Sequence, residues 1–271
     1  MHISGDLANV CIYSNNTEAS RNAESILRNK FAEAGIDAGG NITDDTDLLV
    51  VIGGDGSMLS AIHEYDFPSV PVIGINTGHL GFFQELAPED VELLLERYRQ
   101  GKFSIQRSHA IRAKIYTDAG CETVDGMNEI VIRGPQSYST HLDIYIGDSF
   151  IEKFSGDGIL VASSAGSTAY NYSVGGAIVD PRINVLQVTP IAPMNTTAYR
   201  SFMSSVILPP DMQLNIDPEY KHDRVLYVMN DGFEHKFEGP SHITIEISDK
   251  EISLLRLEDY DFWNKVKTKF L

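Results

Sequence analysis

The stretch Leu48-Leu49-Val50-Val51-Ile52-Gly53-Gly54-Asp55-Gly56-Ser57 decides how the first part of the chain folds. Its five apolar residues predict a buried strand, its glycines predict a turn, and the following residues to Tyr65 predict a helix. Strand and helix patterns alternate on both sides of it: we expect strands at Val10–Tyr13 and Val70–Ile75, and helices at Thr17–Ala34 and Pro88–Arg99. This alternation predicts a parallel, Rossmann-like sheet covered by helices.

The hydrophobic period changes near residue 107. Beyond it, apolar residues alternate with polar ones, as in 111–115, 142–146 and 243–247, which is typical of half-buried strands. The turns Asp118-Ala119-Gly120, Gly147-Asp148 and Asp231-Gly232 favour hairpins between such strands. We therefore expect an α/β domain over residues 1–107 and an all-β, β-sandwich-like domain over 108–254.

The end of the chain has a helical pattern. Residues 259–270 predict a short helix with Phe262, Trp263 and Val266 on one side. The segment from about 255 to 271 is a candidate to pack back onto the α/β domain.

The composition excludes several classes of function. The 271 residues carry 38 acidic and 21 basic side chains, for a formal charge of −17, which opposes binding to nucleic acid or to an anionic membrane. No apolar run approaches the ~20 residues of a membrane span, and the first residues lack the cationic start of a signal peptide. Cys11 and Cys121 stand alone, without the spacing of a zinc site. We expect a cytoplasmic protein.

The sharpest chemical signal is Gly53-Gly54-Asp55-Gly56, at the carboxyl end of the predicted strand. Glycines let the backbone approach a phosphate, and the helix that follows offers free N–H groups to it. In the alternative interpretation, Asp55 caps the helix. The stretch Asn76 to Phe83 follows the next parallel strand, so we expect it to form a wall beside this loop.

Two more signals lie in the second domain. Gly156-Asp157-Gly158 precedes an apolar strand and Gly166-Ser167-Thr168-Ala169-Tyr170, where hydroxyls and an aromatic ring suit a nucleoside. Alternatively, Tyr170 belongs to the core. Asn128-Glu129 could bind a base edge and a ribose diol, or simply form a solvated strand end.

Taken together and in this order, these motifs resemble the NAD kinases, which phosphorylate the adenosine ribose 2′-hydroxyl of NAD. The resemblance also covers Gly175-Gly176-Ala177-Ile178-Val179-Asp180-Pro181 and spans about residues 48 to 209. It implies an active site in a cleft between an α/β and a β-rich domain, and a homodimer or homotetramer. ATP or polyphosphate would be the phosphoryl donor, with Mg²⁺ accompanying the donor and no metal site built from protein side chains alone.

The resemblance also implies roles for individual residues. Asp55 would be the general base that takes the proton of the attacking hydroxyl. The expected binding residues for the dinucleotide and its phosphates are Gly54, Asp55, Gly56, Phe82, Asn128, Glu129, Asp157, Thr168, Ala169, Tyr170, Ser173 and Ala192.

Two positions depart from the family pattern. Ala165 replaces a hydroxylated residue that could meet the adenine, and Ser155 stands where many bacterial members carry arginine. Two other functions fit the same loop: a lipid or sugar kinase, and a non-catalytic dinucleotide sensor. The pattern around Tyr170 argues against the former, and the aspartate beside the phosphate loop argues against the latter.

Overall fold

The computed structural model describes residues 7–78, 81–136, 138–197, 199–221 and 223–271. Contacts between residues divide the chain into two units, Met1–Arg107 with Glu251–Leu271, and Ser108–Lys250. Two long strands, β6 (Phe103–Thr117) and β17 (His242–Leu257), contribute residues to both.

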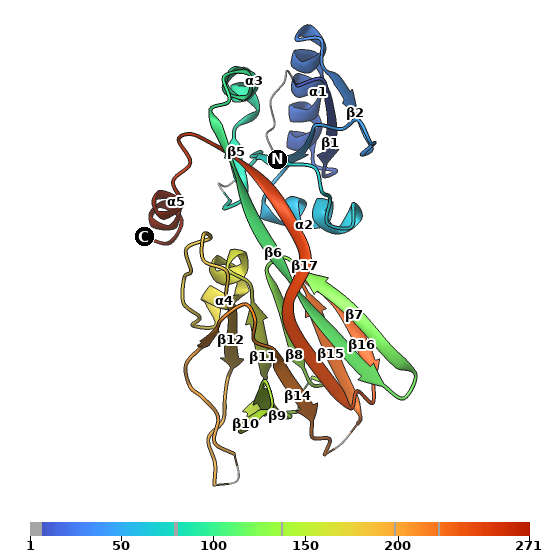
Figure 1. The fold of residues 1–271 in the computed structure, drawn as a ribbon, viewed down its shortest axis with the longest axis vertical. Coiled ribbons are helices and arrows are strands. Elements are labelled where there is room, and N and C mark those ends of the chain that lie inside the picture. The colour runs from blue at the N-terminus through green and yellow to red at the C-terminus, as the bar shows by residue number, and fades with distance from the viewer. Residues whose placement is uncertain (1–6, 79–80, 137, 198, 222) are drawn as a thin grey trace. The chain divides into compact units, whose positions relative to one another are not determined.

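The first unit contains the predicted parallel sheet, with strand order β2-β1-β3-β4-β5. Figure 1 labels β1, β2 and β5 of this sheet. The strands are β1 (Asn9–Ser14), β2 (Asp37–Gly39), β3 (Leu48–Ile52), β4 (Val72–Ile75) and β5 (Gln84–Leu86). Every residue of β3 is buried, as its uninterrupted apolar sequence predicts. The predicted strand at Val70 begins later, at Val72, because Pro71 has no N–H to donate to a neighbouring strand.

The helices of this unit are α1 (Glu18–Glu33), α2 (Asp55–Glu64), a 3₁₀ turn (Pro88–Asp90), α3 (Val91–Arg99) and α5 (Phe262–Phe270). Side chains of α1 and α3 form one core with alternate β3 residues, Leu48, Val50 and Ile52. Thr17 caps α1 by accepting a hydrogen bond from the Ser20 N–H. The expected continuous helix from Pro88 is instead a 3₁₀ turn followed by α3.

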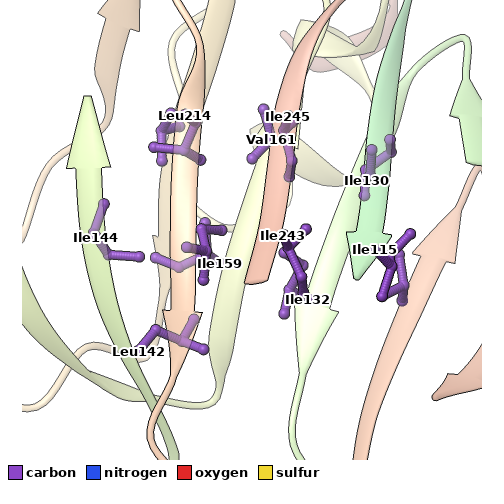
Figure 2. Packing of buried hydrophobic residues seen from close by; sticks show 14 of the residues in the cluster. Ile115, Ile130, Ile132, Leu142, Ile144, Ile159, Val161, Leu214, Ile243 and Ile245 are labelled. Carbon is purple, nitrogen blue, oxygen red and sulfur yellow. The ribbon is translucent and has the colours of Figure 1, made fainter. Parts of the chain in front are cut away.

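The second unit is a β-sandwich. One layer follows the order β10-β9-β14-β17-β6-β7 and the other β13-β12-β11-β8-β15-β16. The strands, besides β6 and β17, are β7 (Gly120–Gly126), β8 (Glu129–Arg133), β9 (Thr140–Ile146), β10 (Ser149–Gly156), β11 (Gly158–Ala162), β12 (Leu186–Ile191), β13 (Val206–Leu208), β14 (Leu214–Pro218), β15 (Val225–Asn230) and β16 (Phe233–Glu238). Side chains from both layers pack into one core, in which Ile132, Ile144 and Ile243 are visible (Figure 2).

The predicted hairpins of the second unit are confirmed. Strands β6 and β7, β9 and β10, and β15 and β16 pair antiparallel across the expected glycine and aspartate turns. Asp231 and Gly232 have positive φ values of 51° and 90°, as a type I′ turn requires. A 3₁₀ turn (Ala165–Thr168) and the short helix α4 (Tyr170–Ser173) follow β11.

The C-terminal helix α5 begins at Phe262, and contacts group it with the first unit. Its buried side contains Val266, whereas Trp263 is 51% exposed. The rings of Phe262 and Trp263 pack edge to face with their centres 5.2 Å apart, and Val266 lies three residues after Trp263, a spacing that places two side chains on one helix face. Within the described ranges, the chain forms no helix with the length and apolar character needed to cross a bilayer.

Candidate active site

The loop between β3 and α2 depends on glycine. Gly53 has a φ of 143°, and a Cβ atom there would lie 2.1 Å from Oγ of Ser57. Gly54 is the N-cap of α2, so the helix begins at Asp55, two residues earlier than expected. Asp55 therefore occupies the first turn, where a carboxylate interacts favourably with the helix dipole. It is not the capping residue that the alternative interpretation required.

Two backbone amides hold the Asp55 carboxylate. The N–H groups of Phe82 and Phe83 donate hydrogen bonds of 3.1 Å to Oδ2 and Oδ1, respectively. The expected proximity of this stretch to the glycine loop is thus observed. The side chain of Asp55 remains 28% exposed, so it is both fixed and accessible. His79 and Leu80, which belong to the same stretch, lie outside the described residues.

Gly81 makes room for this arrangement. A Cβ atom at Gly81 would lie 2.2 Å from Oδ1 of Asp55 and 2.0 Å from Oε1 of Gln84. The carboxylate of Asp55 and the carboxamide of Gln84 are therefore neighbours. Gln84 is completely buried, and neither polar atom of its side chain has a hydrogen-bond partner among the described residues.

Helix α5 covers the ring of Phe82. The rings of Phe262 and Phe270 lie 6.0 and 5.7 Å from it, and Nζ of Lys269 lies 4.7 Å from its centre. Phe82, expected to contact the dinucleotide, is only 8% exposed. Its backbone N–H, rather than its ring, contacts the Asp55 carboxylate in this structure.

A buried ion pair, which the sequence patterns do not indicate, supports the same segment. Nη1 of Arg256 lies 2.6 Å from Oε1 of Glu85, and it also donates 3.3 Å hydrogen bonds to the carbonyls of Phe82 and Phe83. Arg256 thus contacts the carbonyl groups of the two residues whose N–H groups hold Asp55. The pair joins residues 171 apart in sequence, so no local pattern could reveal it.

In the second unit, Asn128 and Glu129 are buried rather than forming a solvated strand end. Their exposed fractions are 5% and 9%, and no described residue forms a hydrogen bond with Oδ1 of Asn128 or Oε2 of Glu129. The backbone of this segment is held by Asp231, whose carboxylate accepts hydrogen bonds from the N–H groups of Met127, Asn128 and Glu129 at 2.6, 2.7 and 3.2 Å. Unpaired buried oxygens are costly, and a polar ligand would relieve that cost.

The electrostatics of Glu129 follow from this burial. Loss of water and, to a smaller extent, the negative charge of Asp231 raise the pKa of its carboxyl, and a backbone hydrogen bond with Tyr170 lowers it in part, so that the pKa is about 8. At neutral pH the carboxyl is therefore mostly protonated. In that form it carries one O–H donor besides its acceptor oxygens.

The segment from Ser163 to Tyr170 lies against Asn128. Ser163 donates its N–H to the Asn128 carbonyl at 2.9 Å, and a Cβ atom at Gly166 would lie 1.9 Å from the same oxygen. The structure therefore brings together Asn128, Glu129 and the residues around Tyr170. The ring of Tyr170 is 39% exposed, which contradicts the alternative that placed it in the core. Thr168 and Ala169 are partly exposed.

The other residues predicted for the second unit are Asp157, Ala192 and Ser173. The N–H of Asp157 donates to the carbonyl of Ile191 at 2.9 Å, which places Asp157 beside Ala192. Ala192 is exposed and has a positive φ of 45°. Ser173 is exposed at the end of α4. Ser155, one of the two departures from the family pattern, is 2% exposed in β10.

No metal-binding cluster is formed by the residues that the structure describes. Among them, no group of three or more His, Cys, Asp or Glu side chains is placed to hold an ion.

Comparison with known proteins identifies the family. Residues 14–103 match the ATP-NAD kinase N-terminal domain and residues 127–257 match the ATP-NAD kinase C-terminal domain. An NAD kinase from Finegoldia magna is 33% identical over 265 residues, which cover 96% of this chain and 97% of that protein. The chain belongs to the NAD kinase family. An NAD kinase from Levilactobacillus brevis is 32% identical, with 97% of each chain covered.

Two solved structures have the same fold as this NAD kinase family member. Yeast NADH kinase complexed with NADH gives a TM-score of 0.83 at 20% identity, covering 98% of this chain and 87% of that one. An NAD kinase from Archaeoglobus fulgidus in complex with ATP gives 0.76 at 19% identity, covering 96% and 98%.

Proposed function

We propose that this protein transfers the terminal phosphate of ATP, or of polyphosphate, to the 2′-hydroxyl of the adenosine ribose of NAD, which yields NADP. The observation that carries the proposal is the Asp55 carboxylate, fixed by two backbone amides yet accessible, in a glycine loop at the carboxyl end of a parallel strand. Ligands of open α/β sheets bind at such positions.

In this mechanism Asp55 orients the hydroxyl and receives its proton. A carboxylate is a weak base toward an alcohol, so the proton moves late, after bond formation to phosphorus has made the hydroxyl more acidic. Catalysis then consists mainly of positioning and neutralising charge, as is usual for phosphoryl transfer.

The nucleoside part of NAD binds, in this proposal, to the second unit. The unpaired oxygens of Asn128 and Glu129 form hydrogen bonds with it, and the exposed Tyr170 stacks on it. Gly54 and Gly56 line the path of the phosphates, and Asp157, Thr168, Ala169, Ser173 and Ala192 complete the set of binding residues.

Magnesium enters, in this proposal, with the phosphoryl donor. Mg²⁺ keeps several waters and binds nucleotide phosphates with one or two carboxylates, so a site without an all-protein cluster fits it. The exposed part of the Asp55 carboxylate is the one candidate protein ligand that we assign among the described residues. We also propose that the protein acts in the cytoplasm. It forms, in this proposal, a homodimer or homotetramer, and light scattering would measure the oligomeric state.

The test is incubation of the purified protein with NAD, Mg²⁺ and either ATP or polyphosphate. An NADP-dependent dehydrogenase should detect the product, and ³¹P NMR should place the new phosphate on the 2′-oxygen. NAD binding without NADP would favour the non-catalytic sensor. Phosphorylation of a lipid or sugar in place of NAD would favour the other kinase class.

A further inference from the structure

The C-terminal helix places a lysine on the proposed catalytic carboxylate. Nζ of Lys269 lies 3.2 Å from Oδ2 of Asp55, and the two side chains are 39% and 28% exposed. The proposed mechanism, which needs Asp55 as a proton acceptor, assigns no role to this ion pair. An ammonium group in this position has donors left for a second partner, because it carries three.

The position of Lys269 is fixed by the helix that carries it. Phe262, Val266 and Phe270 are spaced four residues apart and share one face of α5. Val266 is buried, and both phenylalanine rings contact the ring of Phe82. Asp261 caps the helix by accepting a 3.0 Å hydrogen bond from the Asn264 N–H. Lys269 is therefore held against the site by the packing of an entire helix.

A second lysine from α5 adds positive charge at the same place. Lys265, one turn before Lys269, donates a hydrogen bond to the Gln84 carbonyl. Burial lowers its pKa to about 8, although the Glu85 and Asp55 carboxylates favour its charged form. Two lysines four residues apart repel each other on an isolated helix. Their convergence beside Asp55, in a protein with a net charge of −17, suits an anionic ligand.

The buried carboxamide of Gln84 is an independent sign of a missing polar ligand. It lies beside the Asp55 carboxylate and is completely buried, and within the part of the chain that the structure describes neither its oxygen nor its nitrogen has a hydrogen-bond partner. A buried amide without partners costs free energy that a bound phosphate, or its waters, would recover.

We propose that Lys269 is a ligand of the donor's terminal phosphate, an inference that rests on the proposed function. Without the donor, Lys269 pairs with Asp55. With the donor, its ammonium group moves to a non-bridging phosphate oxygen and leaves Oδ2 of Asp55 to the ribose hydroxyl. The 2′-oxygen then bonds to phosphorus, the bond to the bridging oxygen breaks, and its electron pair leaves with ADP or the shortened polyphosphate. The hydroxyl proton passes to Asp55 and from there to solvent.

The test compares Lys269→Met with Lys269→Arg and with Lys267→Met. Methionine keeps most of the apolar length of the side chain but not its charge, and arginine keeps the charge. Lys267 is an exposed lysine on the same helix and serves as the matched control. Two measurements are made on each protein: steady-state kinetics with NAD and ATP, and calorimetric binding of Mg²⁺-tripolyphosphate without NAD.

We expect Lys269→Met to raise the KM for ATP, or to lower kcat, by about 10-fold or more. The KM for NAD should stay within about twofold. Tripolyphosphate binding should weaken in parallel, and Lys269→Arg should recover most of both losses. The inference is overturned if Lys269→Met leaves ATP kinetics and tripolyphosphate affinity unchanged, or if it speeds turnover. Absence of NADP formation by the unaltered protein would instead refute the proposed function, and the calorimetric comparison would still decide the role of Lys269.

Discussion

The guanidinium of Arg256 lies 2.6 Å from the carboxylate of Glu85, and both side chains are almost completely buried, with exposed fractions of 5% and 3%. The same guanidinium holds the carbonyls of Phe82 and Phe83, whose N–H groups fix Asp55. The backbone of these two residues is thus bound on one side by a cation and on the other by the proposed catalytic base.

Breaking this pair should destabilise the protein strongly. Arg256→Met or Glu85→Gln alone leaves one charged or polar group buried without its partner, so we expect each to lower the free energy of unfolding by about 3–5 kcal/mol. The double variant should cost much less than the sum of the two single changes. Urea denaturation of all four proteins measures the coupling, and additive losses would show that the pair contributes no interaction of its own.

Replacing the proposed base should separate binding from chemistry. Asp55→Asn keeps the size and one acceptor oxygen of the side chain but cannot take a proton. NADP formation should fall by about 100-fold or more, while NAD binding measured by calorimetry should change little. Near-normal turnover in this variant would remove Asp55 from the reaction.

A substitution at Gly81 should displace the Asp55 carboxylate without changing its chemistry. The Cβ of Gly81→Ala would lie 2.2 Å from Oδ1, so the Asp55 side chain must move. We expect kcat to fall by about 10- to 100-fold, because small displacements of a reacting group are costly. Gly40→Ala is the control, since nothing lies within 4 Å of the added atom. Equal activity of the two variants would show that the position of Asp55 is not critical.

The pKa of Glu129 predicts how stability depends on pH. The folded carboxyl titrates at about 8, against an ordinary value of 4.5. Between these values the folded protein holds a proton that the unfolded chain has lost, so the free energy of unfolding falls as pH rises. The slope due to this one group is at most about 1.4 kcal/mol per pH unit.

Denaturant unfolding at pH 5, 6, 7 and 8 tests this. Glu129→Gln should remove this group's part of the slope, whereas Glu122→Gln, at an exposed glutamate in β7, should retain it. If the curves of the Glu129 variant and the unaltered protein run parallel, the carboxyl is ionised in the folded protein at these pH values.

Local patterns predicted most of the fold. The apolar run at Leu48–Ile52 and the turn at Asp231-Gly232 each carry their structural information within a few residues, and the structure contains both as expected. Boundaries were less accurate where two signals compete. Helix α2 begins at Asp55 because Gly54, which has no side chain to donate or accept, still serves as its N-cap.

Long-range contacts account for what the sequence could not reveal. Lys269 and Asp55 are 214 residues apart, and neither position carries a local signal of the other. The burial of Asn128 and Glu129 was likewise unexpected, because their polar side chains predict exposure. It results from the packing of the 163–170 segment against Asn128 and from the Asp231 carboxylate that holds their backbone.

The mostly neutral state of Glu129 bears on how an acidic protein can admit a ligand that carries a pyrophosphate. An ionised glutamate would repel that anion with one more negative charge, whereas the protonated form adds no repulsion. The uncharged carboxyl can still donate one hydrogen bond and accept another, so in the proposed binding mode a ribose hydroxyl could serve as either its acceptor or its donor.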